Sequence, residues 1–140
     1  MSTLKVNTVQ HNTSGFNNVV QFSDGAGTQN GTLCRAFVNF NGTGTVAIRD
    51  DFNVSSITDL GTGDYRVNFS NSLSNQNYCT VASVCSNGSI NGAVNSVDIY
   101  SRSNTNVVTP DTSSYYLYVY HDNNSVAQDC VYICATTFAT

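Results

Sequence analysis

The sequence contains no glutamate and no tryptophan, only one lysine (Lys5) and only one proline (Pro110). Charged residues make up 10% of its 140 residues, and all 9 acidic residues are aspartates. Glutamate, lysine, arginine and glutamine favour helices, whereas asparagine, serine and threonine compete with the helical backbone for hydrogen bonds. A chain that is poor in the first group and rich in the second, with many valines and tyrosines, is typical of an all-β protein.

Basic residues are scarce as well. The four arginines are scattered along the sequence, and the formal net charge is −4. Nucleic-acid binding requires clustered lysines and arginines, so we expect no nucleic-acid partner. The opening MSTLKVNTVQHNTSG lacks the apolar stretch of a secretory signal, and no run approaches the ~20 apolar residues of a membrane-spanning helix. The sequence therefore predicts no membrane insertion and no export by the usual route.

The 5 cysteines show no metal-binding spacing. No Cys-X-X-Cys pair occurs, and His11 and His121 lie far apart in the sequence, so a zinc site is poorly supported. Cys130 and Cys134, if they share one strand, lie about 13 Å apart at ~3.3 Å per residue, which is too far for a disulfide. We interpret the cysteines as small buried apolar residues.

Catalytic motifs are missing too. The neighbours Asp50 and Asp51 would point to opposite faces of a strand. The segment 122–124 fits an ordinary turn better than a calcium loop, and neither a Gly-X-Ser-X-Gly motif nor a phosphate-binding loop occurs. We expect no enzyme activity, no cofactor and no bound metal. The alternative, a carbohydrate-active enzyme, would need two aspartates that face each other across a cleft.

Alternating apolar and polar residues predict about ten strands at a spacing of roughly 8–12 residues, the pattern of a sandwich or barrel. The clearest half-buried strand covers 64–69, where Tyr65, Val67 and Phe69 share one face. The ranges 78–86 and 130–138 carry apolar residues on both faces, so we expect both to be central strands. We expect a loop over 23–32, which is rich in glycine and asparagine.

The first 30 residues differ from the rest of the chain. They contain two short strand-like segments among turn-rich loops, which would be marginally stable alone. We therefore divide the chain into an N-terminal arm for attachment or oligomerisation, residues 1–30, and a β-sandwich domain, residues 31–140. The apolar residues that we expect to make the contacts of the arm are Leu4, Val6, Val9, Phe16, Val19 and Phe22.

A row of tyrosines marks the strand predicted over 115–121. Tyr116, Tyr118 and Tyr120 share one side of it. Such a row can stack on sugar rings or fill a subunit interface, and it can equally be covered by its own domain. We take this row, with the polar loops 87–95 and 103–114, as the candidate receptor-contact surface. The candidate contact residues in the loops are Asn87, Asn91 and Asn104.

The stretch from Ala36 to Asn77 contains two Gly-Thr-Gly turns separated by an Asn-Val-Ser-Ser-Ile-Thr-Asp segment. It resembles a module found in virion proteins of tailed phages, especially marine phages and cyanophages, where it occurs in tail-fibre and similar structural proteins. The segments that carry the resemblance are FVNFNGTGTVAIR (37–49), NVSSITD (53–59), GTGDY (61–65), VNF (67–69) and NY (77–78), together with the opening MSTLKVNTVQ.

The resemblance implies a homotrimeric, non-enzymatic virion component, built as an antiparallel β-sandwich of jelly-roll type whose N-terminal arm attaches to the particle. Such a protein would be made in the host cytoplasm and located in the virion. We expect a short tail fibre or fibre-tip component that adheres to the host surface. Its partners would be other tail or capsid proteins and a host surface glycan or protein. The alternative is a capsid decoration or head-fibre protein bound to the capsid through residues 1–30.

Overall fold

The computed structural model describes residues 19–24, 27–85, 95–102, 107–121 and 125–139. Within these ranges every regular element is a β-strand and no helix occurs. All strand pairs are antiparallel. The prediction of an all-β chain with antiparallel sheets is therefore confirmed.

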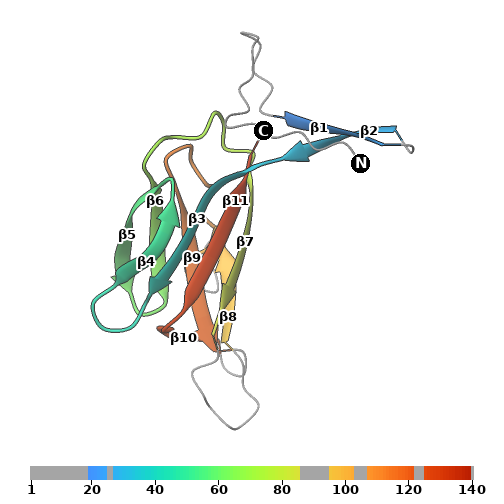
Figure 1. Ribbon diagram of the computed structural model, residues 1–140. Coiled ribbons are helices and arrows are strands. Elements are labelled where there is room, and N and C mark those ends of the chain that lie inside the picture. Colours follow the sequence, from blue (N-terminus) through green and yellow to red (C-terminus); the bar gives the residue numbers. More distant parts are fainter. Residues whose placement is uncertain (1–18, 25–26, 86–94, 103–106, 122–124, 140) are drawn as a thin grey trace.

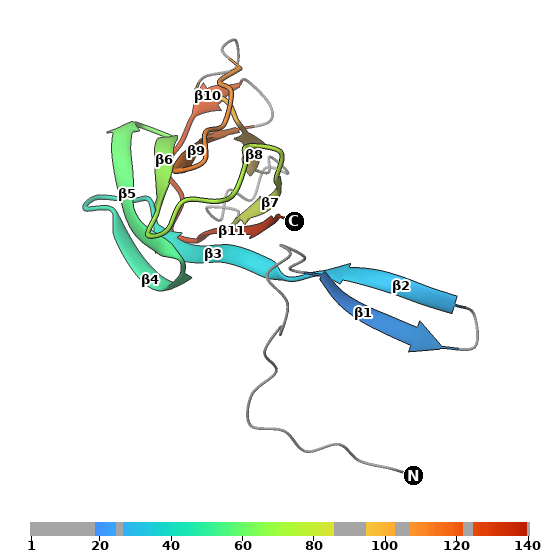
Figure 2. The ribbon, with the colours of Figure 1, turned by 90° about the horizontal axis from the view of Figure 1, so that it is seen from above.

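Two sheets face each other as the two layers of a sandwich (Figure 2). The first sheet has the strand order β4 (Ala47–Phe52), β3 (Cys34–Asn41), β11 (Ile133–Phe138) and β7 (Cys79–Val84). The second sheet is centred on β9 and β6, and its members are β5 (Val54–Gly61), β6 (Asp64–Phe69), β9 (Ser114–His121), β8 (Asn95–Ile99) and β10 (Val126–Ala127). Both β8 and the short β10 pair with β9.

A separate hairpin precedes the sandwich. Its strands, β1 (Val19–Asp24) and β2 (Gly27–Thr32), form a two-stranded sheet of their own. Leu33 alone joins β2 to β3, and the hairpin extends away from the end of the sandwich where β3 begins (Figures 1 and 2). The range 23–32, which we predicted as a loop, thus contains a strand. The segment GTQNGT has no apolar residue, so it gives no alternation signal.

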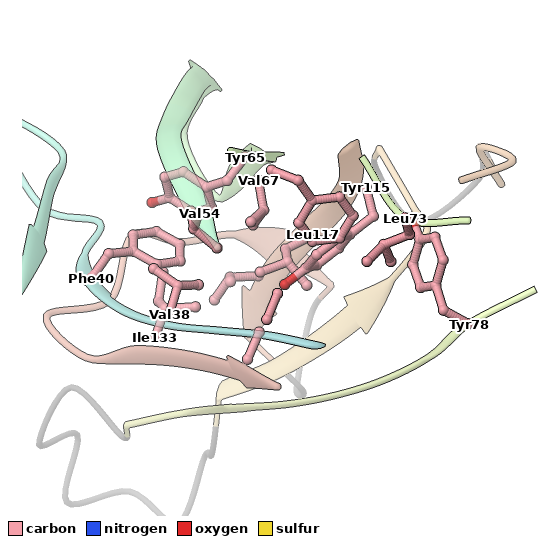
Figure 3. Close-up of a cluster of buried hydrophobic side chains, with 14 of the residues drawn as sticks. Val38, Phe40, Val54, Tyr65, Val67, Leu73, Tyr78, Tyr115, Leu117 and Ile133 are labelled. Carbon is pink, nitrogen blue, oxygen red and sulfur yellow. The ribbon is translucent and has the colours of Figure 1, made fainter. Parts of the chain in front are cut away.

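The core lies between the two sheets and consists of alternate residues of their strands. In β6 the predicted alternation is confirmed, because Tyr65, Val67 and Phe69 are buried while the residues between them are only partly covered. Figure 3 shows side chains of both sheets meeting in this layer. The most deeply buried large side chains are Phe40, Val38 and Ile133 from the first sheet and Tyr65, Val67, Tyr115, Leu117 and Val119 from the second.

Asn53 turns the chain from the first sheet into the second, between β4 and β5. Its φ of 58° lies in the left-handed region, which asparagine tolerates better than most residues. Its side-chain Nδ2 donates to the carbonyl oxygens of Arg35 and Asn71, each at 3.1 Å, and its Oδ1 accepts the N–H of Asn71 at 2.8 Å. One amide side chain therefore fixes this corner of the sandwich.

A hydrogen-bonded group, here called the Tyr65 cluster, joins three connections of the chain. The Tyr65 hydroxyl lies 2.6 Å from Asp129 Oδ1 and 3.0 Å from the carbonyl oxygen of Gly42. The hydroxyl has one hydrogen, and the shorter bond to the charged carboxylate takes it. The same Oδ1 accepts the N–H of Gly63 at 2.8 Å. The β3–β4 turn, the β5–β6 turn and the segment before β11 are thus held together.

Two further strands differ from the sequence prediction. The last strand was predicted over 130–138, but β11 begins at Ile133, and Cys130 precedes it with its carbonyl oxygen bound to the N–H of Gly42 at 2.8 Å. The expectation that 78–86 is central is wrong, because β7 ends the strand order of the first sheet. The expectation that the last strand is central is confirmed, because β11 lies between β3 and β7.

Substituting Gly63 should destabilise the fold far more than substituting Gly44. Both have left-handed φ, of 69° and 64°. A Cβ at Gly63 would collide with the carbonyl oxygen of Val119 and lie 2.9 Å from the backbone nitrogen of Gln128. A Cβ at Gly44 would meet no atom of the described residues within 4 Å. We expect Gly44→Ala to cost about 1–2 kcal/mol of unfolding free energy and Gly63→Ala about 1–3 kcal/mol more. Urea unfolding measures both, and equal losses would contradict this account.

Stability should fall in alkaline solution. Burial raises the pKa of Tyr65, Tyr78 and Tyr115, and at Tyr65 the hydrogen bond to Asp129 raises the pKa further. In the unfolded chain these phenols ionise near pH 10, so above roughly that pH the unfolded state binds fewer protons than the native state. We expect full stability below about pH 10 and a progressive loss between about pH 10 and 12. Urea titrations at each pH, with tyrosinate absorbance as a second signal, test this, and a flat profile would refute it.

Candidate functional site

The predicted tyrosine row lies on the outer face of the second sheet. Strand alternation places it there, because the residues between its members, Leu117 and Val119, belong to the core, as does Tyr115 just before them. On the neighbouring strands Asp64 and Asp98 both stand in register with Tyr118. We call this surface the tyrosine face, and its members are Tyr116, Tyr118, Tyr120, Asp64, Arg66, Asp98 and Arg102.

The rings of the row are held by one another and by a carboxylate. Tyr118 and Tyr120 stack with centroids 5.7 Å apart and planes inclined by 22°. The Tyr120 hydroxyl donates to Asp98 Oδ1 at 3.3 Å. Tyr118 is only 7% exposed, whereas Tyr116 and Tyr120 are half-buried. Tyr116 and Tyr120 are therefore the accessible members of the row.

Arg102 joins the tyrosine face from the segment after β8. Its Nε lies 3.2 Å from Asp64 Oδ2, and its guanidinium lies 5.6 Å from the centre of the Tyr116 ring. Since 43% of the arginine side chain is exposed, this pair adds little to stability. The buried atoms Asp64 Oδ1 and Arg66 Nε have no hydrogen-bond partner among the described residues. The face thus combines aromatic rings that are held in place with charged side chains of both signs.

This arrangement offers groups that can bind a partner. Tyrosine rings offer flat apolar surfaces together with polar hydroxyls, and such groups recur where one side of a partner is apolar and the other is wet. Asp64 on β6 and Asp98 on β8 are both in register with Tyr118 on β9, one on each side of it. Both carboxylates therefore belong to the same surface. A sugar ring or a flat polar side chain of another protein matches these groups.

Among the predicted receptor-contact residues that the structure describes, it brings the three tyrosines together on one face. The loop candidates Asn87, Asn91 and Asn104 lie outside the described residues. In the predicted arm, Val19 and Phe22 belong to β1, where they pair with Thr32 and Gln29. The remaining arm candidates also lie outside the described residues, and they are Leu4, Val6, Val9 and Phe16.

All 5 cysteines are free thiols, and no group of three histidines, cysteines or acidic residues suited to a metal occurs in the described part of the chain. Cys130 is fully buried, and burial raises its pKa to about 11, with the neighbouring Cys85 adding to this effect. Its sulfur accepts a hydrogen bond from Asn95 Nδ2 at 3.1 Å. Because the thiolate is the reactive form, Cys130 is a structural residue rather than a nucleophile.

Sequence reasoning missed a second surface, the outer face of the first sheet. Large apolar side chains are exposed on it, and they include Phe52, Val81 and Phe138. The available signal was that 78–86 and 130–138 are apolar on both faces, which we read as a sign of central strands. In β7 the outward set is instead accessible, with Cys79, Val81 and Ser83 exposed.

Comparison with known proteins adds no assignment. The chain matches no family model, no curated protein and no solved structure. Among the described residues, no helix is long and apolar enough to cross a membrane. Function is therefore argued from the two outer faces of the sandwich and from the sequence.

Cys130 should resist alkylation in the folded protein. At pH 8 a thiol with its raised pKa is ionised to roughly one part in a thousand, whereas an ordinary cysteine is ionised to about a quarter. We expect iodoacetamide to leave Cys130 unmodified in native protein and to modify it fully in urea. Peptide mass spectrometry reads each site separately, and equal rates in both conditions would contradict the burial of this thiol.

Proposed function

We propose that the protein is a non-enzymatic structural protein of a tailed-phage virion, a short tail fibre or fibre-tip component for adhesion to the host surface. The observation that carries the proposal is the tyrosine face, an outward row of held aromatic rings flanked by charged groups. The assignment to a virion rests on the resemblance of residues 36–77 to the tailed-phage module.

The same proposal includes a homotrimer with a jelly-roll sandwich and an attachment arm. In support, β3 and β11, the first and last strands of the sandwich, are neighbours, and the chain passes repeatedly between the two sheets. The hairpin of β1 and β2 pairs outside the sandwich and extends away from it, as an element that holds another protein would (Figure 1).

Adhesion through this face would depend on repetition. A surface with two accessible rings offers little area for a single contact. With three copies on one fibre tip, the second and third copies bind after the first is already attached, so their contacts are intramolecular. Linked sites of this kind gain affinity by a factor of roughly 10²–10⁴ without any new contact. The host ligand is a surface glycan or protein that can lie across Tyr116 and Tyr120.

The alternative is a capsid decoration or head-fibre protein bound to the capsid through residues 1–30. It is favoured by one specific observation, the free-standing hairpin, because an isolated two-stranded hairpin is marginal until something packs on it. Immunogold labelling of virions, or cryo-EM of the particle, separates the two roles. Density or label on the tail tip supports the fibre, and label over the capsid overturns it.

Removing the accessible rings should slow host adsorption. We expect the double variant Tyr116→Ala, Tyr120→Ala to adsorb at least about tenfold more slowly, since a loss of roughly 1.4 kcal/mol corresponds to a tenfold drop in affinity. Leu60→Ala, which trims another partly exposed side chain of the second sheet, is the matched control. Phage adsorption assays measure the rate. A mass in solution and a melting temperature equal to those of the wild type show that the variant keeps its fold. Normal adsorption of the double variant would refute the proposed contact surface.

A further inference from the structure

The tyrosine face arranges its rings and its charged side chains in parallel rows. The rings stand along β9, whereas Asp64 and Arg66 lie on β6 and Asp98 lies on β8, the strands to either side. Neighbouring strands are about 4.8 Å apart, so the backbones that carry the two aspartates are separated by about 10 Å across β9. A ligand that follows β9 can therefore rest on the rings and reach polar groups on both sides.

The two accessible rings belong to residues four apart on one strand. At ~3.3 Å per residue, Tyr116 and Tyr120 are separated by about 13 Å along β9, and Tyr118 between them is almost covered. One sugar ring has a similar size to one phenol ring, so a single sugar cannot lie on both tyrosines. The spacing favours an extended ligand that is built from several linked rings.

The rings are held in place before any ligand arrives. Tyr120 stacks on Tyr118, and its hydroxyl donates to Asp98 Oδ1 at 3.3 Å. At the other end of the row, the guanidinium of Arg102 lies over the ring of Tyr116 and supplies N–H donors beside it. Binding to side chains that are already ordered loses less conformational entropy than binding to mobile ones.

The charged side chains of the face balance one another. Two aspartates and two arginines belong to it, although the whole chain has a net charge of −4. An acidic ligand would be opposed by both carboxylates, and a basic ligand by both guanidinium groups. A hydroxyl group donates and accepts hydrogen bonds, so a neutral ligand rich in hydroxyls can satisfy aspartate and arginine alike.

The same charges disfavour a protein as the ligand. The centre of a protein–protein interface is typically depleted of charged residues, and a charge that is buried there without a partner weakens binding. On the tyrosine face every ring has a charged side chain in register or in contact with it. A sugar chain leaves water at its edges, so these charged groups keep partners when it binds.

We propose that the tyrosine face binds a neutral, linear oligosaccharide segment of the host surface, which lies along β9 across Tyr116 and Tyr120. This inference rests on the adhesion role of the proposed function and names the chemical class of its ligand. The rings contact the apolar faces of the sugars, while Asp64, Asp98 and Arg102 bind the hydroxyl groups.

The test uses polysaccharide that is extracted from the surface of host cells and separated by anion exchange into a neutral and an acidic fraction. Surface plasmon resonance measures binding of the full-length protein to each immobilised fraction. We expect the wild type to bind the neutral fraction, with less than about a twofold change between about 0.05 and 0.5 M salt, because salt screens charge pairs. No binding to this fraction, or tighter binding to the acidic one, would overturn the proposal.

A matched pair of aspartate variants locates the binding surface. We expect Asp98→Ala to bind the neutral fraction at least about tenfold more weakly, because hydrogen bonds to its carboxylate are lost and Tyr120 loses its anchor. Asp50→Ala, on an exposed position of β4 in the first sheet, should bind as the wild type does. Melting temperatures show that both variants fold, and equal binding by the two would contradict the proposed surface.

A measurement on the wild type alone tests the length of the ligand. Partial hydrolysis of the neutral fraction gives single sugars and longer fragments, which then compete with the immobilised polysaccharide. We expect the longer fragments to compete at least about tenfold better than single sugars, because only they reach both accessible rings. Equal competition by single sugars would show that the ligand does not extend along β9.

The outcomes separate this inference from the adhesion proposal. If neither fraction binds the wild type while the tyrosine double variant adsorbs slowly, the glycan is wrong and adhesion through this face stands. If the wild type binds the neutral fraction while the double variant adsorbs normally, the glycan site stands and its role in adsorption is wrong.

Discussion

The hydrogen bond from Tyr65 to Asp129 is the constraint on which the sandwich depends. Asp129 lies just before the last strand, Tyr65 lies at the start of β6, and the shared carboxylate oxygen also holds the backbone of Gly63. The carbonyl oxygen of Gly42, from the first Gly-Thr-Gly turn, lies 3.0 Å from the same hydroxyl, and the N–H of Gly42 donates to the carbonyl oxygen of Cys130 just before the last strand. The two turns that define the sequence module therefore meet at one phenol, which ties the first sheet to the second. The turns are joints of the sandwich.

Alternation in the sequence was sufficient for the strands that bury one face. In β6 the pattern Tyr65, Val67, Phe69 predicted both the strand and the side that faces the core. It failed where a strand has no apolar residue, as in β2, and where apolar residues occupy an exposed face, as in β7. The early start predicted for β11 failed for a third reason. Cys130 is buried by side-chain packing near Asn95 and Cys85, outside any strand, and burial alone does not distinguish the two cases.

The tyrosine row itself could be predicted from residue spacing, but its environment could not. Spacing places Tyr116, Tyr118 and Tyr120 on one side of a strand. The partners come from β6, from β8 and from the segment after β8, so they depend on a strand order and register that no local pattern specifies. The near-complete burial of Tyr118 is a further consequence of that register. Asn87, Asn91 and Asn104 were chosen from composition alone, and composition carries no information on which loops lie beside which sheet face.

The shortage of charged residues has two physical interpretations. Either amides and hydroxyls keep the surface soluble in place of charges, or some faces are covered in an assembly and need no charges. The charged residues are distributed unevenly between the two outer faces. Charges stand among the rings of the tyrosine face, whereas β7 and β11 have none. An edge strand usually avoids adding further strands through charged side chains or prolines, and β7, with the sequence CTVASV, has neither. A chain that left this strand and its apolar face open would be prone to open-ended association.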